Sequence, residues 1–220
     1  MSPATDLQDR VLRELRFDPR VEASKIGVTA TPNGTVTLTG TVNSYTEKLA
    51  AEEAAKRVAG VRAIANDIEV VLPGTSRRSD TAIAEAALNA LKSRATPLDN
   101  IKVIVKNGWV TLEGEVEYYY QKQEAERAVS VLAGVTGVTN NIRVRPVPHT
   151  PKEEEVKKEI EDALIRSARL DARSITVEVR GTNVMLRGSV RSWAEREEAE
   201  NAAWAVPGVL EVETRIEVTP

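Results

Sequence analysis

The sequence predicts an α+β fold built from three tandem modules. One seven-residue pattern, which alternates apolar and polar residues around a glycine, occurs at 36–42, 110–116 and 184–190. Its glycines, Gly40, Gly114 and Gly188, follow one another at intervals of 74 residues. A repeat at a fixed period indicates an array of similar structural units. Each unit of this 220-residue chain has roughly 70 residues, a size at which a domain buries only about 60% of its unfolded surface.

Each module is expected to open with an amphipathic helix. Apolar residues recur at every fourth position, which places them on one helical face. They are Leu7, Val11 and Leu15, then Ile83, Ala87 and Leu91, then Val156, Ile160 and Leu164. In the third module, Thr150 and Glu153 are expected to form a capping box, with Pro151 at the first helical position.

A β-hairpin is expected after each of these helices. Asn33-Gly34 and Asn107-Gly108 predict tight turns in which both central residues have positive φ, and Gly181-Thr182-Asn183 is a weaker signal. The first turn is one residue longer and contains Pro32, so a β-bulge is expected there. In the second strand the apolar residues face a core, and the alternate residues face solvent.

A second helix and a third strand complete the predicted αββαβ module. Ser44 with Glu47, and Ser192 with Glu195, form S-x-x-E capping boxes. We expect the small residues of this helix to lie close to the mid-strand glycine. Gly60, Gly134 and Gly208 are expected to end the helix as C′ residues with positive φ. The third strand should run parallel to a neighbour, which gives a three-stranded mixed sheet with two helices on one face.

The predicted boundaries follow from this pattern. The modules span 1–72, 79–146 and 151–220. The linker 73–78 should be flexible, whereas the proline-rich linker 147–150 should be a semi-rigid spacer.

The composition argues against an enzyme. The absence of cysteine excludes disulfides, thiolate metal sites and cysteine nucleophiles. The single histidine, His149, lies in a linker, so a Ser-His-Asp triad cannot be assembled. Neither a Walker loop nor a G-x-G-x-x-G motif is present. We therefore expect no cofactor, no metal and no small-molecule substrate.

The charge and the N-terminal sequence bear on partners and location. A net charge of −3 gives no general attraction to nucleic acid. Residues 73–147 carry ten Lys and Arg against eight Asp and Glu, so the middle module alone is positive. The first residues contain no apolar core of a signal peptide, and no segment is long enough to span a membrane. We expect a cytoplasmic protein, or a periplasmic one if a signal peptide has been removed.

The repeat resembles the BON domain. The resemblance rests on the run V-T-L-x-G-x-V, on the aromatic residue that starts the second helix, and on G-V-x-x-V-x-N-x-[IL]-x-V at 60–70 and 134–144. In the third copy Thr214 replaces the asparagine. This family resemblance implies an αββαβ fold and a non-enzymatic role in binding phospholipid surfaces, maintaining envelopes and responding to osmotic stress.

Several aromatic and basic residues are candidates for binding. Tyr45, Tyr119 and Trp193 share one repeat position and are interpreted as structural. Trp109 should lie on the solvent side of the sheet beside Lys102, Ile104 and Lys106. Further candidates are Tyr118, Tyr120, Lys122 and Trp204, the last expected to be exposed on the second helix of its module.

These residues leave three functions open. The first is peripheral binding of anionic phospholipid, centred on the middle module. The second is self-assembly into a homo-oligomer or filament, in which the aromatics would pack against a neighbouring module or subunit. The third is a cytoplasmic ion or osmotic-stress sensor, which rests on the family resemblance alone.

Overall fold

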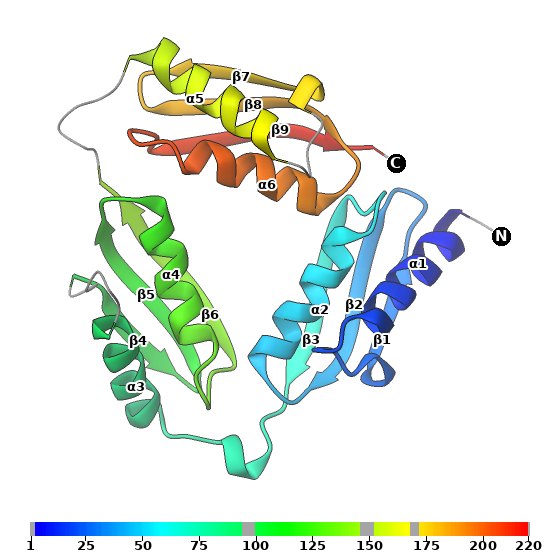
Figure 1. The fold of residues 1–220 in the computed structure, drawn as a ribbon. Helices are drawn as coiled ribbons and strands as arrows, with labels where there is room; N and C mark the ends of the chain where they lie inside the picture. Colours follow the sequence, from blue (N-terminus) through cyan, green and yellow to red (C-terminus); the bar gives the residue numbers. More distant parts are fainter. Residues whose placement is uncertain (1–2, 94–99, 146–151, 168–171, 220) are drawn as a thin grey trace. The chain divides into compact units, whose positions relative to one another are not determined.

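The computed structural model describes residues 3–93, 100–145, 152–167 and 172–219. Within these ranges, the chain forms three three-stranded sheets, each accompanied by two α-helices (Figure 1). This confirms the predicted α+β class and its three αββαβ modules. The linker 147–150, including His149, lies outside the described residues, as do Thr150 and Pro151.

The elements recur in the same order in each module. The first contains α1 (Pro3–Phe17), β1 (Ile26–Ala30), β2 (Thr35–Val42), α2 (Tyr45–Arg57) and β3 (Ala63–Val70). The second contains α3 (Asp80–Lys92), β4 (Lys102–Lys106), β5 (Trp109–Val116), α4 (Tyr119–Ser130) and β6 (Gly137–Val144). The third contains α5 (Glu153–Arg166), β7 (Ile175–Arg180), β8 (Asn183–Val190), α6 (Trp193–Trp204) and β9 (Glu211–Val218). The linker 73–78 includes a short 3-10 helix, Gly74–Ser76.

The second strand of each module lies at the centre of its sheet. It pairs antiparallel with the first strand, as in Val103↔Leu112 and Val177↔Leu186. In the middle and third modules it pairs parallel with the third strand, as in Gly114↔Ile142 and Gly188↔Ile216. The helix before the third strand carries the chain back across the sheet, which is the connection that parallel pairing requires.

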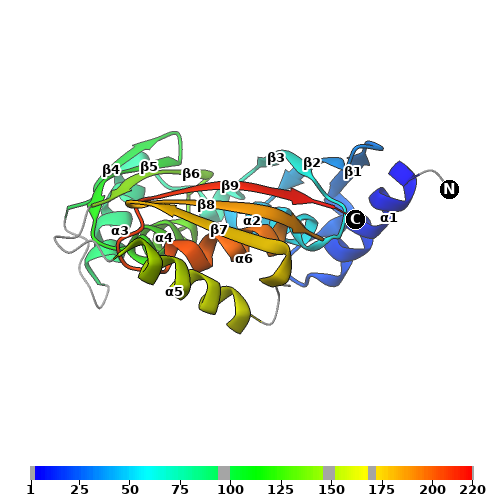
Figure 2. The ribbon, with the colours of Figure 1, turned by 90° about the horizontal axis from the view of Figure 1, so that it is seen from above.

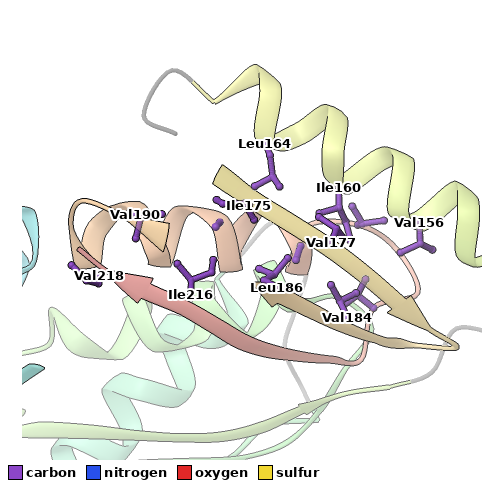
Figure 3. Packing of buried hydrophobic residues seen from close by; sticks show 14 residues of the cluster. Val156, Ile160, Leu164, Ile175, Val177, Val184, Leu186, Val190, Ile216 and Val218 are labelled. Carbon is purple, nitrogen blue, oxygen red and sulfur yellow. The ribbon is translucent and has the colours of Figure 1, made fainter. Parts of the chain in front are cut away.

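The core of each module lies between its helices and one face of its sheet. In the third module, α5 and α6 cover the same side of β7-β8-β9 (Figure 2). Val156, Ile160 and Leu164 of α5 point toward Val177, Leu186 and Ile216 on the sheet (Figure 3). Ile83, Ala87 and Leu91 of α3 are buried in the same way. The four-residue spacing therefore identified the inner faces of these helices correctly.

The second helices begin largely as predicted. The Ser44 hydroxyl accepts a hydrogen bond from Glu47 N, while Glu47 Oε2 accepts one from Asn43 N. Ser192 and Glu195 repeat this arrangement, with Arg191 N as the second donor. The middle module has Tyr118 at this position, and the Gln121 side chain accepts hydrogen bonds from Glu117 N and Tyr118 N instead.

The capping box predicted for α5 was wrong. This helix starts at Glu153, and its N-cap is Lys152, whose side chain makes no capping hydrogen bond. Glu153 contacts the hairpin instead, where its Oε1 accepts a hydrogen bond from Gly181 N. Asp80 does the same in the middle module, accepting from Asn107 N and Gly108 N. An acidic residue at the helix start thus satisfies the backbone of the turn.

The reason proposed for the mid-strand glycines also needs correction. Gly114 has a φ of +145°, and a Cβ there would collide with Asn100 O and crowd Ile101 Cα. Gly40 and Gly188 meet the chain in the same way, at Lys25 and Ser174. The close backbone is therefore the segment that enters the neighbouring antiparallel strand, not the second helix.

The helix-end glycines have positive φ, as predicted, but they are not C′ residues. Gly134 has a φ of +94° and lies four residues beyond Ser130, the last residue of α4. It is the third residue of a turn closed by Val135 N and Leu132 O. Positive φ at this position is what a type II turn requires. Gly60 and Gly208 occupy the same place in equivalent turns.

The three hairpins use different turns. Asn107 and Gly108 both have positive φ, as the prediction required. In the first module Asn33 does not; Thr31 O accepts from Gly34 N, and Gly34 has a φ of +84°. This is a three-residue loop with a glycine bulge, which confirms the expected irregularity. In the third module Gly181 alone is positive, as in a type II′ turn.

Candidate functional site

The most distinctive solvent-facing surface is the side of the β4-β5-β6 sheet opposite its helices. Val110, Leu112 and Val116 of β5 are buried, so the alternate residues of this strand point to the other side. The strand register places neighbours from β4 and β6 beside them. We call the part of this surface around the indole the Trp109 face, which comprises Lys102, Ile104, Lys106, Trp109, Thr111 and Thr139. Glu113 and Glu115 of β5 lie further along the same side of the sheet.

The Trp109 side chain lies flat on this face. Trp109 is paired with Gly137 across β5 and β6. Three successive atoms of its six-membered ring lie within 2.7 Å of the place where a Gly137 Cβ would stand. Such similar short distances mean that this Cβ would point into the face of the ring, not at its edge. The Trp109 Nε1 donates a hydrogen bond of 2.9 Å to Thr139 Oγ1, which fixes the ring's rotation.

One side of the indole therefore covers the sheet and the other side is open. Trp109 remains 48% exposed and Ile104 40% exposed. A shallow cleft of about 460 Å³ borders the ring. Its lining includes Ile104, Lys106, Asn107, Thr111 and Thr136 beside the indole. The cleft thus combines apolar surface with hydroxyl, amide and ammonium groups.

The charges on this side of the sheet are unevenly neutralised. Lys102 Nζ lies 3.7 Å from Glu113 Oε2, an exposed contact that contributes little. Lys106, which is paired with Trp109 in the register, forms no ion pair with any residue that the structure describes. Positive charge is therefore available next to the indole.

The other aromatic candidates of this module lie elsewhere. Tyr118 and Tyr120 stack on each other, with ring centroids 5.8 Å apart, and both are exposed. Trp109 begins β5, whereas Tyr118 follows its end. At about 3.3 Å per strand residue, more than 20 Å separates them along the sheet. Lys122 is half-buried, and its backbone oxygen accepts a hydrogen bond from Asn140. The sequence-predicted residues thus form two patches, not one.

Trp204 is less exposed than the sequence predicted. This residue ends α6 and is only partly exposed, because its ring packs against the core of the third module. The repeat position predicted an outward residue, but the large side chain still packs against this core. Tyr45, Tyr119 and Trp193 are each the first residue of their helix and are half-buried. The Arg196 guanidinium lies 5.0 Å from the Trp193 ring centroid.

Sequence reasoning missed the residues that hold the indole in place. Gly137 stands where the other modules have Ala63 and Glu211, and Thr139 where they have Ala65 and Glu213. Only the middle module combines a tryptophan with a glycine and a threonine at these positions. Comparing the three repeats by position was the signal that could have revealed this combination.

Two further findings concern membrane spans and metal sites in the described residues. No helix of the described residues is long and apolar enough to cross a membrane. Nor do the described residues contain a group of three or more His, Cys, Asp or Glu that could hold a metal ion.

Comparison with known proteins decides the family. The model of the BON domain matches residues 3–71, 79–146 and 152–220. The chain belongs to the BON family. It is 34% identical over 143 residues to the osmotically-inducible protein Y of Escherichia coli. The matched region covers 58% of this chain and 69% of that relative. These findings do not support the cytoplasmic location expected from the N-terminal sequence.

Solved structures resemble this BON protein only weakly. CdsD, a structural protein of the type III secretion system of Chlamydia trachomatis, matches at 14% identity with a TM-score of 0.26, over 96% of this chain and 91% of CdsD. The PrgH periplasmic domain matches at 9% identity with a TM-score of 0.24, over 89% of this chain and 96% of the PrgH domain. At these values the likeness carries no structural argument.

Proposed function

We propose that this BON protein is a non-enzymatic binding protein that associates peripherally with anionic phospholipid through the Trp109 face. The observation that carries the proposal is an open indole with Ile104 beside it and Lys106 lining the same cleft. Lys102 lies further along β4, on the same side of the sheet. Tryptophan favours the membrane–water interface, and each basic residue near an anionic surface contributes about 1 kcal/mol. The likeness to an osmotically-inducible protein favours a role in osmotic stress.

The electrostatic part of the proposal rests on the middle module. Residues 73–147 carry a net charge of +2, while residues 148–220, with eleven Lys and Arg against fifteen Asp and Glu, carry −4. A negative membrane surface would therefore attract the middle module and repel the third. Binding should depend on salt, because ions screen exposed charges over about 10 Å at 0.1 M.

The experiment is co-sedimentation with anionic and with zwitterionic vesicles, beside a spin without vesicles. We expect pelleting with anionic vesicles, lost at high salt and weakened by Lys106→Gln and by Trp109→Thr. Lys92→Gln is the matched control, because it removes one exposed charge from α3 of the same module. Equal pelleting of the Lys106 and Lys92 variants would contradict the assigned surface. No pelleting of the wild type would contradict lipid binding.

Self-assembly is the alternative, favoured by the similarity of the three modules and by the proline-rich linker. The partial burial of Trp204 against its own module weakens the third support, an exposed aromatic residue. The vesicle-free spin tests the remaining possibility, since an assembly large enough to act as a filament would sediment alone.

A further inference from the structure

The orientation of Trp109 bears on which anionic headgroup the face would bind. A tryptophan that anchors a protein by insertion projects its ring from the surface. Here one ring face is covered by Gly137, and Nε1 is already bonded to Thr139 Oγ1. What remains for a ligand is one flat, electron-rich ring face, held in a fixed position.

A flat ring face of this kind suits a rigid ring that presents C–H groups. The face of an aromatic ring carries negative potential, so it attracts the weakly positive C–H bonds of a cyclic polyol. A linear headgroup cannot present several C–H bonds to one plane at once without losing conformational freedom.

The groups around the indole match the rest of such a ligand. Asn107, Thr111 and Thr136 line the cleft and carry amide and hydroxyl groups that can bond ring hydroxyls. Lys106 also lines it and supplies a positive charge without an ion-pair partner among the described residues. A cleft of about 460 Å³ lies within the size range of small-ligand sites, about 300–1,000 Å³.

We propose that the Trp109 cleft binds a phosphorylated cyclic polyol, with the polyol ring stacked on the indole and the phosphate beside Lys106. This inference rests on the proposed function, because the same face would meet the membrane. It narrows the ligand to anionic lipids whose headgroup is a sugar or cyclitol ring. The same chemistry is available in a soluble sugar or cyclitol phosphate.

The other modules supply an internal comparison. The positions equivalent to Trp109 and Gly137 hold Thr35 and Ala63 in the first module. In the third module they hold Asn183 and Glu211. Replacing Trp109→Thr together with Gly137→Ala therefore gives the middle sheet a pair of residues that the first module already accommodates. Circular dichroism should show that this double variant is folded.

The decisive measurement uses a soluble probe, so it does not depend on vesicles. myo-Inositol 1-phosphate is titrated into the ¹⁵N-labelled protein, with glycerol 1-phosphate as the control that has the phosphate but no ring. We expect a saturable shift of the Trp109 indole N–H signal, identified by its loss in the double variant. Glycerol 1-phosphate should bind at least tenfold more weakly. Equal binding of the two phosphates, or no shift with either, would overturn the inference.

Two variants and one vesicle comparison complete the test. Lys106→Gln should weaken inositol phosphate binding at least fivefold, and Lys92→Gln should leave it unchanged. Phosphatidylinositol vesicles should pellet more wild-type protein than phosphatidylglycerol vesicles of equal charge, and the double variant should lose this preference. Equal pelleting on both lipids would leave the proposed function intact and contradict the ring preference. Probe binding without any pelleting would uphold the polyol site and contradict lipid association.

Discussion

The middle and third modules differ mainly where the shared packing does not constrain them. Val110 and Leu112 of β5 correspond to Val184 and Leu186 of β8, and all four are buried. Their strand registers match residue for residue along the parallel pair. On the opposite side of the sheet the two modules differ. Trp109 and Gly137 of the middle module are replaced by Asn183 and Glu211 at the equivalent positions of the third. The comparison teaches that the repeat keeps the buried residues similar, whereas the residues on the solvent-facing side of the sheet can differ between modules.

A second difference lies between the third strand and the second helix of each module. Asn140 on β6 donates hydrogen bonds from Nδ2 to Lys122 O and Glu126 Oε2 on α4. Asn66 makes the corresponding bond to Glu52 in the first module. In the third module Thr214 stands at this position, and its buried hydroxyl has no hydrogen-bond partner in the described structure. The strand-to-helix hydrogen bond at this repeat position is thus present in two modules, and Thr214 does not replace it among the described residues.

The largest expected effect tests whether the two cores are equivalent. Leu112→Ala and Leu186→Ala each empty a fully buried site at the same repeat position, and each should destabilise its own module by about 2–5 kcal/mol. Amide hydrogen exchange measures this separately in β5 and β8. Loss of protection in both strands from either single variant would show that the modules unfold together and would break the comparison.

The next effect should have opposite signs in the two modules. Asn140→Ala leaves Glu126 and the Lys122 carbonyl without their partner, which should cost about 1–3 kcal/mol. Thr214→Val removes an unsatisfied hydroxyl at nearly constant volume and should stabilise the third module by about 1 kcal/mol. Amide hydrogen exchange, read out separately in the middle and third modules, measures the change in stability caused by each variant. A destabilised Thr214→Val protein would show that the hydroxyl has a partner in solution.

The first module extends the comparison to acid stability. Asp18 is 7% exposed and bonds to Arg20 and Arg57. The hydrogen bonds from Arg20 are the main cause that lowers its pKa well below the usual range, against the opposing effect of burial. A carboxylate with a lowered native pKa contributes stability above its unfolded pKa, near 3.9, and loses it as the pH falls through the native pKa.

Asp18→Asn should therefore remove stability at neutral pH and flatten the acid dependence. The expected loss is about 1.5 kcal/mol, at the low end for charged hydrogen bonds because Arg20 and Arg57 are partly exposed. Unfolding of the first module, measured from pH 7 down to pH 2, gives both values. If the Asp18→Asn variant lost as much stability below pH 4 as the wild type, Asp18 would not be the source of the acid dependence.

The smallest effect tests how the indole sits on the sheet. Gly137→Ala should cost about 1 kcal/mol in the wild type, because the new methyl group points into the ring face. In the Trp109→Thr background the same change should instead stabilise the strand by about 0.5 kcal/mol, since glycine is unfavourable there. A double-mutant cycle measures this reversal. Additive effects would show that the ring does not rest on Gly137 in solution.

The repeat pattern predicted more of the fold than of the site. Spacing alone identified the buried residues of α1, α3 and α5, because burial on one helical face imposes a period near 3.6. The Ser44 and Ser192 caps were also predictable, since they depend on residues three apart. The α5 cap was not, because Glu153 bonds to a turn 28 residues away.

By itself, therefore, the sequence determined the number of modules, their class and the inner faces of their helices, and it singled out Trp109 as a candidate. These features depend on local spacing and on repetition. The tertiary structure decided why Gly114 must be glycine, where the Trp204 ring packs, and that Trp109 lies flat on Gly137. Each of these depends on contacts between residues that are distant in the chain and adjacent only in the folded module. The spacing of apolar residues does not encode such contacts, so the packed sheet was needed to show how these residues touch.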